Sequence, residues 1–573
     1  MRLFCLTALI AAAVPFLGGC TTTTHAKTAE APRKKLGIRP YGDETIKINM
    51  DRIPDQEKKV FAWIDEHIDE HVENLQKWIQ QPSVSNSGEG IQESAEMVKG
   101  FFDKLGCQKT QVYDVGVSKW GQMGNPVVFA QCDEGQPKTL LIYWMYDTMP
   151  VTQADAWVAP PFEGRLVDGQ TAGINPKFRK VLIGRGATNS KGPEMTELNA
   201  LMSMKAVMGH LPANLIIIAE GDEERMSMGL NKFVTTHPDL IKPADAMLMF
   251  GSQNGRGPAS ISGASEGLMY LELTTSGSAW GRGPTVSDIH GIFKRSVDSP
   301  AWRHIQMLST LIKPDGNTPN IAGWDEHLKP VSKEADARLH EAAKTTDLKQ
   351  MADIVGVARF RSDDPYEVLK MTNFGTAFNL DGIWGGNMYA GGSGAILPNK
   401  ITSKHSIRYV PDMESGDIVK KIRAHLDSHG YKDVQLRLIG DQPWSTMTFD
   451  TDVAHSVEAM YDHFNIPWKA PISKTSTAAG NENVDDTGMG GAWPGYLFTN
   501  GKQGDPGTTP IGLPIAGGSA GYGGRAHAAN EYWVIEGADN IYGMAGAEKS
   551  IVDEFFNYAS MNTTPPKGKF IPK

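Results

Sequence analysis

The sequence predicts an α/β fold, in which a doubly wound, mostly parallel sheet forms a catalytic domain and an α+β lid (dimerisation) domain is inserted. Residues 140–143, 215–219 and 246–250 are short, continuous apolar runs, as expected of strands buried on both faces. A helical pattern over residues 194–207 separates the first two runs, and strands that alternate with helices favour a parallel sheet. A change to alternating strand patterns near residue 268 predicts the insertion.

The first part of the chain predicts two helices and a strand pair. Apolar residues recur every three or four positions over residues 60–79, which predicts an amphipathic helix that Pro82 ends. A second helix is expected over 97–105, followed by strands over 108–115 and 126–131.

The inserted lid is expected to pair two helices with an antiparallel sheet. Residues 269–274 and 403–410 alternate like strands, whereas 299–311 and 417–429 are amphipathic. Residues 312–370 form a longer helical and loop excursion.

After the lid the α/β pattern returns, with a helix expected over 453–464 and a strand over 495–499. The predicted divisions are a signal peptide, a tether, the first catalytic segment, the lid and the second catalytic segment, over residues 1–20, 21–50, 51–267, 268–446 and 447–573.

The N-terminus is typical of a secretory signal. Arg2 precedes an apolar stretch over 3–17, and Leu17-Gly18-Gly19-Cys20 resembles the bacterial lipobox, in which the cysteine is lipidated. A retained membrane helix is the alternative, but the stretch is shorter than the ~20 residues that cross a bilayer. We therefore expect an exported lipoprotein of the cell envelope, held at the membrane by a lipid on Cys20. Thr21 favours the periplasmic face of an outer membrane.

Composition excludes one class of partner. The formal net charge is −10 and the sequence contains no run of basic residues, so the chain does not resemble a nucleic-acid-binding protein. Four cysteines occur, two of them in the signal. Cys107 and Cys132 flank the predicted strand pair and are expected either to form a disulfide or to remain buried thiols.

Four loops carry most of the chemically informative residues. They are Y-W-M-Y-D-T-M-P at 143–150, I-G-R-G-A-T-N-S-K-G at 183–192, A-E-G-D-E-E at 219–224 and a Gly-rich segment at 517–531 that ends in H-A-A-N-E. Two of them directly follow predicted strands, where open α/β sheets bind ligands. Each motif alone has a structural explanation, but their combination and order indicate a site.

These motifs resemble the carnosinase and carboxypeptidase-G family of metallopeptidases (metallopeptidase family 20), especially its carnosinase-like branch. The resemblance extends from Gln56 to Gly537 and includes W-V-A-P-P-F at 157–162, S-I-R-Y-V-P at 406–411 and G-G-A-W-P at 490–494. It implies a two-zinc catalytic domain and a lid that often dimerises. It also implies hydrolysis of amide bonds near the free carboxylate of small peptides and acylated amino acids.

Part of the family's site is retained. By resemblance, Glu223 is the general base, Glu224 and His527 are metal ligands, and Asp147 braces the first metal-ligand loop. In the lid, His290 matches the histidine that reaches into the partner subunit's site, and Arg408 matches the arginine that binds the substrate carboxylate.

The remaining family ligands are replaced. Met145 stands where the family has its first histidine ligand, Asn189 where it has the bridging aspartate, and Gly251 or Ser252 where it has a further aspartate. Ala492 replaces a serine. One zinc position therefore loses all three ligands, whereas the other loses only the charge of its bridge.

We accordingly expect zero or one zinc per chain and no nucleotide. Glu224 and His527 would hold the zinc, with a weak contribution from Asn189, because zinc prefers charged carboxylates, imidazole or thiolate. We interpret Met145 as a packing residue.

Three functions remain open. The first is a single-metal amide hydrolase, with Glu223 as base and His290 stabilising the oxyanion. The second is metal-independent chemistry on a more reactive bond by Glu223, Glu224, His527 and Lys191. The third is a binding protein in which Arg408 captures a peptide or amino-acid conjugate without cleaving it.

Overall fold

The computed structural model describes residues 35–249, 259, 261, 265–328, 330, 331, 333–355, 357–391, 393–410, 413–448, 450–468, 475–477, 492–499 and 512–562. Residues from Ile38 onward form one compact unit, to which the description below applies. The predicted signal peptide, the lipidation site Cys20 and the positions Gly251 and Ser252 lie outside the described residues. None of the described helices combines the length and hydropathy needed to cross a bilayer.

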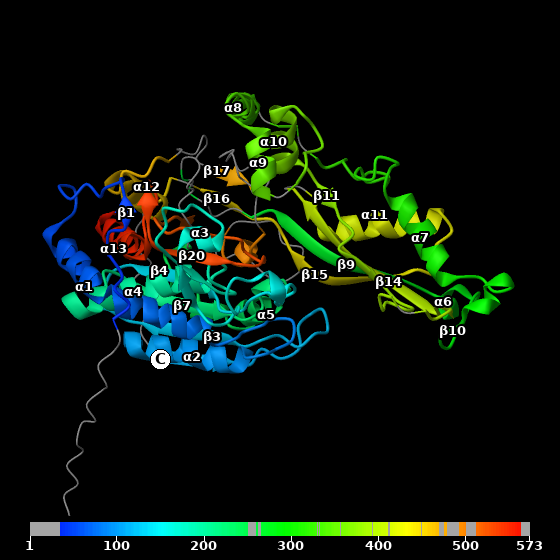
Figure 1. Cartoon of the computed structure of the whole chain (residues 1–573), viewed down its shortest axis with the longest axis horizontal. Helices are drawn as coiled ribbons and strands as arrows, with labels where there is room; N and C mark the ends of the chain where they lie inside the picture. Colours follow the sequence, from blue (N-terminus) through cyan, green and yellow to red (C-terminus); the bar gives the residue numbers. More distant parts are fainter. Residues whose placement is uncertain are drawn as a thin grey trace, which may run out of the picture. The chain divides into compact units, whose positions relative to one another are not determined.

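A six-stranded sheet forms the centre of the catalytic domain (Figure 1). Strands β18, β8, β4 and β7 are parallel, and β3 and β2 continue the sheet in antiparallel fashion. Every residue of β4 and β7 is buried, as the apolar runs predicted. In order across the sheet, the strands are β18 (Ile515–Gly517), β8 (Ala246–Met249), β4 (Thr139–Met145), β7 (Asn214–Glu220), β3 (Val127–Cys132) and β2 (Lys109–Tyr113).

Helices cover this sheet because their apolar faces match its buried strands. Helices α1, α4 and α13 pack against one another, α2 packs on β2 and β3, and α12 packs on β8 and β18. The predicted apolar positions of α1, from Val60 to Ile79, are buried. The bounds are α1 (Asp55–Ile79), α2 (Ile91–Leu105), α4 (Lys191–Met208), α5 (Met228–Thr236), α12 (Asp452–His463) and α13 (Met544–Ser560).

The predicted strand over 495–499 is wrong. Pro494–Leu497 is a short 3-10 helix, and the strand that completes this edge of the sheet is β18. Pro494 has no N–H to give to a strand ladder but fits the first turn of a helix. The apolar side chains that suggested a strand are nevertheless buried, and Tyr496 accepts a hydrogen bond from Asn231 at 2.7 Å.

The tether predicted over 21–50 is too long. Strand β1 (Asp43–Glu44) pairs in parallel with β21 (Ala538–Asp539), and the Arg39 guanidinium donates to Glu536 at 2.8 Å. Residues 38–50 therefore belong to the folded body.

Cys107 and Cys132 form a disulfide, so the structure decides between the two alternatives that the sequence left open. The bond joins the residues just before β2 to the last residue of β3, its antiparallel neighbour.

A second, smaller sheet was not predicted and positions two of the loops. Its order is β19-β20-β6-β5, from β5 (Arg165–Val167), β6 (Lys180–Ile183), β19 (Gly523–Gly524) and β20 (Tyr532–Glu536). Because Tyr532 pairs with Ile183 in antiparallel register, the loop that follows β6 meets the loop that precedes β20. These strands were missed because they are short and pair residues about 350 positions apart.

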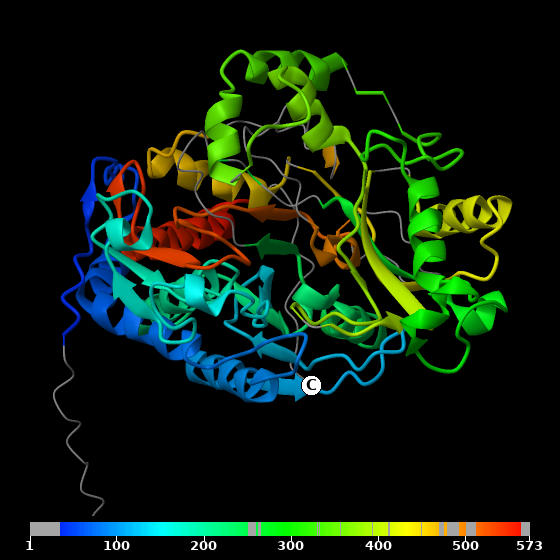
Figure 2. The ribbon, with the colours of Figure 1, turned by 45° about the vertical axis from the view of Figure 1, so that its right-hand side comes forward.

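The lid has the predicted arrangement of helices on an antiparallel sheet. Strands β11 (Ala377–Phe378), β14 (Lys400–Tyr409), β9 (Gly267–Ser276) and β15 (Gln435–Gln442) lie in that order, and β12 (Gly382–Trp384) also pairs with β14. Helices α7 (Pro300–Leu311) and α11 (Ser415–Ser428) pack on one face. The excursion holds α8 (Lys333–Ala343), α9 (Leu348–Val355) and α10 (Pro365–Phe374), which Figure 2 shows as a group separate from α7 and α11.

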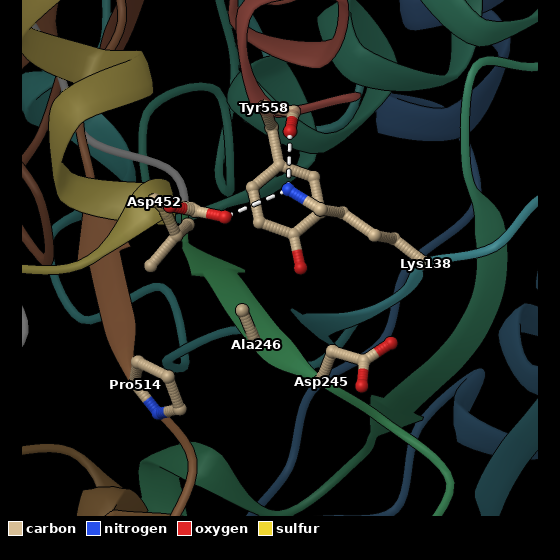
Figure 3. Close-up of a pocket in the computed structure, with 7 residues that line it drawn as sticks. Lys138, Asp245, Ala246, Asp452, Pro514 and Tyr558 are labelled. Carbon is tan, nitrogen blue, oxygen red and sulfur yellow. Dashed lines mark hydrogen bonds and ion pairs between the residues drawn. The ribbon is translucent and has the colours of Figure 1, made fainter. Parts of the chain in front are cut away.

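A buried lysine ties the catalytic domain together at the amino edge of the sheet (Figure 3). Lys138, just before β4, donates to Asp452 at the start of α12 at 2.8 Å, and to the Tyr558 carbonyl near the end of α13 at 2.9 Å. The cavity beside it, about 10 Å³, holds one water at most. The motif loops lie at the opposite, carboxyl edge of β4 and β7.

Candidate active site

Three predicted site residues converge at one point. The Asn189 amide nitrogen lies 2.8 Å from Glu224 Oε1 and 3.0 Å from His527 Nε2. His527 Nε2 lies 2.8 Å from the same Glu224 oxygen. The Glu224 side chain is buried, whereas that of His527 is 52% exposed, so the cluster is open to solvent on the His527 side. The neighbouring Glu224 carboxylate raises the pKa of His527.

Asp147 orients the loop that carries the two glutamates. Its carboxylate is fully buried and accepts the backbone N–H groups of Glu223 at 3.2 Å and Glu224 at 3.1 Å. Burial, followed by the charge of Glu224, raises the pKa of Asp147 to about 8. Asp147 was expected to brace the first metal-ligand loop, but it holds the loop that carries Glu223, the predicted general base.

Glu531 and Arg185 form the frame that joins the other two loops. The buried Glu531 carboxylate accepts the backbone N–H groups of Gly186 and Thr188 at 3.0 Å and of Asn189 at 2.9 Å. Arg185 donates to Glu531 at 2.8 Å and to the His527 carbonyl at 3.2 Å. This pair therefore fixes Asn189 and His527 relative to each other.

Glu223 lies beside this cluster. It is half-buried, and burial, followed by the charges of Glu224 and Asp147, raises its pKa well above the usual value for a carboxyl group. The Arg408 guanidinium, from β14 of the lid, acts in the opposite direction. Arg408 also forms an ion pair with Glu266, while its side chain remains 39% exposed.

Met145 lies in a buried, hydrogen-bonded segment at the end of β4. The Met145 backbone N–H donates to Glu194 and the Trp144 indole N–H donates to Glu197, each at 2.6 Å. All four side chains are buried. Among the described residues, the Met145 thioether is not a ligand that zinc prefers.

Lys191 lies outside the cluster. Its buried ammonium donates to the carbonyls of Gln81 at 2.7 Å and Trp78 at 3.2 Å, at the end of α1. Burial lowers its pKa to about 7. Because its hydrogen bonds fix the end of α1, we assign it a structural role instead of the acid-base role that the sequence suggested.

His290 is not brought to the site of its own chain. It is exposed in β10 (Ile289–His290), and the adjacent Asp288 accepts a hydrogen bond from the Asn399 backbone at 2.8 Å. Asn399 precedes β14 by one residue, whereas Arg408 lies near its other end. Asn399 and Arg408 are nine positions apart along the strand, which corresponds to about 30 Å. Figure 1 shows β10 at the end of the lid far from β4 and β7.

One further group of potential ligands lies on the lid surface. Among the described residues, Glu326, His327 and Asp417 form the one cluster of three His, Cys, Asp or Glu side chains with metal-like spacing. The Lys421 ammonium contacts both carboxylates at 2.7 Å. A lysine thus already supplies the positive charge there.

The residues at the second position fit one cation. Glu224 Oε1, His527 Nε2 and the Asn189 amide lie within 3.0 Å of one another, and a single set of hydrogens does not satisfy all three contacts. If the Asn189 amide turns by 180°, three lone pairs face one point. The described residues of this position therefore offer donors for one cation.

The family model "Peptidase family M20/M25/M40" matches residues 142–541, which is more than half of the chain. The chain belongs to this peptidase family. The match includes the β4, β6 and β7 loops, the lid and the His527 loop, and it confirms the resemblance and the prediction of a peptidase-fold enzyme.

Sequence relatives of this M20 chain include two groups of dipeptidases. The Cys-Gly metallodipeptidase dug1 of Schizosaccharomyces pombe is 28% identical over 385 residues, covering 64% of this chain and 75% of that protein. The human Beta-Ala-His dipeptidase is 26% identical over 414 residues, covering 69% and 77%.

Solved M20 structures confirm the fold. The dipeptidase Dug1p of Saccharomyces cerevisiae has a TM-score of 0.68 at 21% identity, covering 88% of this chain and 99% of that one. Human carnosine dipeptidase 1 has a TM-score of 0.67 at 20% identity, covering 88% and 100%. These likenesses support the predicted catalytic domain with an inserted lid.

Sequence reasoning named the cluster but missed its supports. Arg185 and Glu531 stood inside the quoted motifs, but their pairing across 346 residues left no local signal. Glu194 and Glu197 did leave a local signal. Two acidic residues three positions apart near the start of a mostly apolar, buried helix are unusual.

Proposed function

We propose that the chain is an amide hydrolase of small peptides or acylated amino acids that uses at most one divalent cation, with zinc as the first candidate. The observation that carries this proposal is the convergence of Glu224, His527 and Asn189 beside the half-buried carboxyl of Glu223. The dipeptidase relatives support the substrate class.

When bound, such a cation would polarise a carbonyl oxygen and lower the pKa of a bound water. Glu224 and His527 would hold it, together with the Asn189 amide oxygen. The neutral amide makes this a weaker site than one with a second carboxylate.

Glu223 acts as the base in this proposal. It takes a proton from water as the water oxygen attacks the scissile carbonyl carbon, and it returns that proton to the amine as the C–N bond breaks. Products are a carboxylic acid and a free amine. Glu223 must be ionised for the first step, and its raised pKa suits the second, because the carboxyl group then holds the proton until the amine leaves.

Arg408 selects substrates that end in a carboxylate. Its guanidinium faces Glu223 from the lid and is paired with Glu266, yet it remains partly exposed. A substrate carboxylate can therefore bind it in the bidentate fashion that arginine favours.

We propose that two copies pair through the lid. His290 lies about 30 Å along β14 from Arg408 of its own chain, so only a second copy can bring a His290 to this site. The lid also exposes apolar side chains, including Ile292 at 53%, Phe293 at 51% and Trp302 at 61%. Such a patch is typical of a protein interface.

We also propose that the mature chain is anchored by a lipid on Cys20 in the cell envelope. The short apolar segment and the Leu-Gly-Gly-Cys tetrad support this location. Metabolic labelling with a fatty acid tests it, and Cys20→Ala should abolish the label.

The decisive experiment combines metal content with dipeptide turnover. We expect up to one zinc per purified chain and a loss of about 10²–10⁴-fold in kcat for Glu223→Gln. Glu93→Gln, an exposed substitution on α2, is the matched control.

A binding protein is the second candidate, and the loss of the first metal position favours it. Saturable dipeptide binding without product, equal in the wild type and Glu223→Gln, would contradict the hydrolase and support this alternative.

A further inference from the structure

Tyr270 occupies the face of the lid sheet that carries Arg408. On β9 its neighbours Met269 and Leu271 are fully buried in the lid core beneath the helices, whereas Tyr270 is half-buried and points to the other face. It pairs directly with Ser406 of β14, and Arg408 is the next residue on the same face of that strand. Side chains in this diagonal relation are within reach of each other.

The other strand beside Tyr270 packs against the loop of the two glutamates. On β15, the register partner of Tyr270 is Gly440, next to a bulge. Gly440 has no side chain, and an added Cβ would lie only 2.6 Å from Met226, two residues after Glu224. The strand next to Tyr270 is therefore in direct contact with the loop of the catalytic glutamates.

The Tyr270 hydroxyl lies within the electrostatic reach of the site's charged groups. Among the described residues it has no hydrogen-bond partner, although Ser406 opposite it donates to Asp381 at 2.9 Å. Its electrostatic environment includes Asp381, Arg408, Glu224 and Glu223. Burial raises the pKa of Tyr270, so the phenol keeps its proton near neutral pH and remains a donor.

We propose that Tyr270 is a further catalytic residue, whose hydroxyl donates a hydrogen bond to the scissile carbonyl oxygen as negative charge develops there. This inference rests on the proposed function and deepens it. No proton is transferred by Tyr270: Glu223 moves the proton from water to the leaving amine, while the phenol stabilises the oxyanion and is released unchanged.

The substrate geometry supports this role. In a dipeptide the scissile carbonyl and the terminal carboxylate are separated by one amide nitrogen and one α-carbon. Arg408 and Tyr270 are diagonal neighbours on one face, so one can hold the carboxylate while the other reaches the carbonyl. Such a donor is valuable here, because this site lacks the first metal position and, within a single chain, His290.

The test is the steady-state kinetics of Tyr270→Phe with a dipeptide that the wild type cleaves. Removal of one oxyanion donor should lower kcat roughly 10²-fold, with KM nearly unchanged. Thr274→Val, on the same face of β9 but farther along the strand and bonded to Thr402 at 3.0 Å, is the control and should keep wild-type kcat.

The outcomes separate the two proposals. If the wild type cleaves dipeptides and Tyr270→Phe matches it in kcat, the role of Tyr270 is overturned while the hydrolase stands. If the wild type binds a dipeptide without cleaving it, the hydrolase proposal fails. The dipeptide Kd, measured by calorimetry, then tests the hydrogen bond from Tyr270. Binding that is weaker by about fivefold or more in Tyr270→Phe supports this hydrogen bond, and an equal Kd overturns it. A wild type that neither binds nor cleaves dipeptides overturns both.

Discussion

The residues at the two metal positions that the resemblance implies differ in their surroundings in this M20 chain. At the first, Met145 stands where the resemblance places a histidine ligand, and the Met145 backbone N–H and the Trp144 indole donate to two buried glutamates at 2.6 Å. At the second, Asn189, Glu224 and His527 still converge within 3.0 Å, and His527 faces solvent. The described residues of the first position are thus buried, whereas the second position is open to solvent on the His527 side.

This difference shows that supports can outlast ligands. Asp147 still fixes the glutamate loop, and Glu531 with Arg185 still fixes the Asn189 and His527 loops. Burying such a framework of polar and charged side chains costs free energy. Its presence therefore favours a working site.

The largest expected effect comes from breaking the frame of the second position. Glu531→Ala removes the partner of a buried arginine and the acceptor of three backbone N–H groups. We expect a loss of about 3–5 kcal/mol in the free energy of unfolding, measured by denaturant titration. A loss below 1 kcal/mol would show that the frame is not needed.

Asn189→Asp should sharpen the contrast between the positions. A carboxylate restores the charge missing from the second position, and we expect zinc to bind about 100-fold more tightly in calorimetry. Met145→His, at the first position, is the matched comparison and should leave zinc affinity unchanged. Equal gains in both variants would contradict the distinction drawn here.

A pH effect is expected from Glu197, which accepts the indole N–H of Trp144. Burial raises the pKa of Glu197 to about 8, compared with about 4.3 in an unfolded chain. The folded state therefore binds the proton more tightly, and this stabilisation is present at low pH and is lost as pH rises through 8. Between pH 6 and pH 8 we expect Glu197 to contribute a loss of about 2 kcal/mol in unfolding free energy, and Glu197→Gln should remove this contribution.

The smallest effect is expected at Met145 itself. Met145→Leu conserves volume and keeps the backbone N–H that Glu194 accepts, so it should cost less than about 1.5 kcal/mol. Metal content and turnover should not change. A clear drop in bound zinc in this variant would mean that the thioether takes part in the site.

Local patterns predicted the central sheet because its strands are buried on both faces, so that 140–143 and 215–219 read as unbroken apolar runs. The family resemblance, and not these patterns, predicted the Asn189–Glu224–His527 cluster, which the structure brings together. Local patterns failed for short strands whose partners lie far away in the sequence, as β6 and β20 do.

Two other failures have different causes. The apolar run that begins with Pro494 forms a 3-10 helix. Its side chains are buried as a strand's would be, but Pro494 has no backbone N–H to donate to a strand ladder. The structural role of Lys191 depends on carbonyl groups more than 100 residues away, which no sequence motif marks.

The disulfide has a consequence for association between molecules. Strand β2 is the outer strand of the six-stranded sheet, and an outer strand offers unpaired backbone groups to any other chain. The Cys107–Cys132 bond ties this strand to its neighbour at one end, so the pair cannot easily peel apart and expose β3. Chains made under reducing conditions should therefore self-associate into aggregates sooner than oxidised chains, which makes an oxidising compartment the appropriate place to produce the protein.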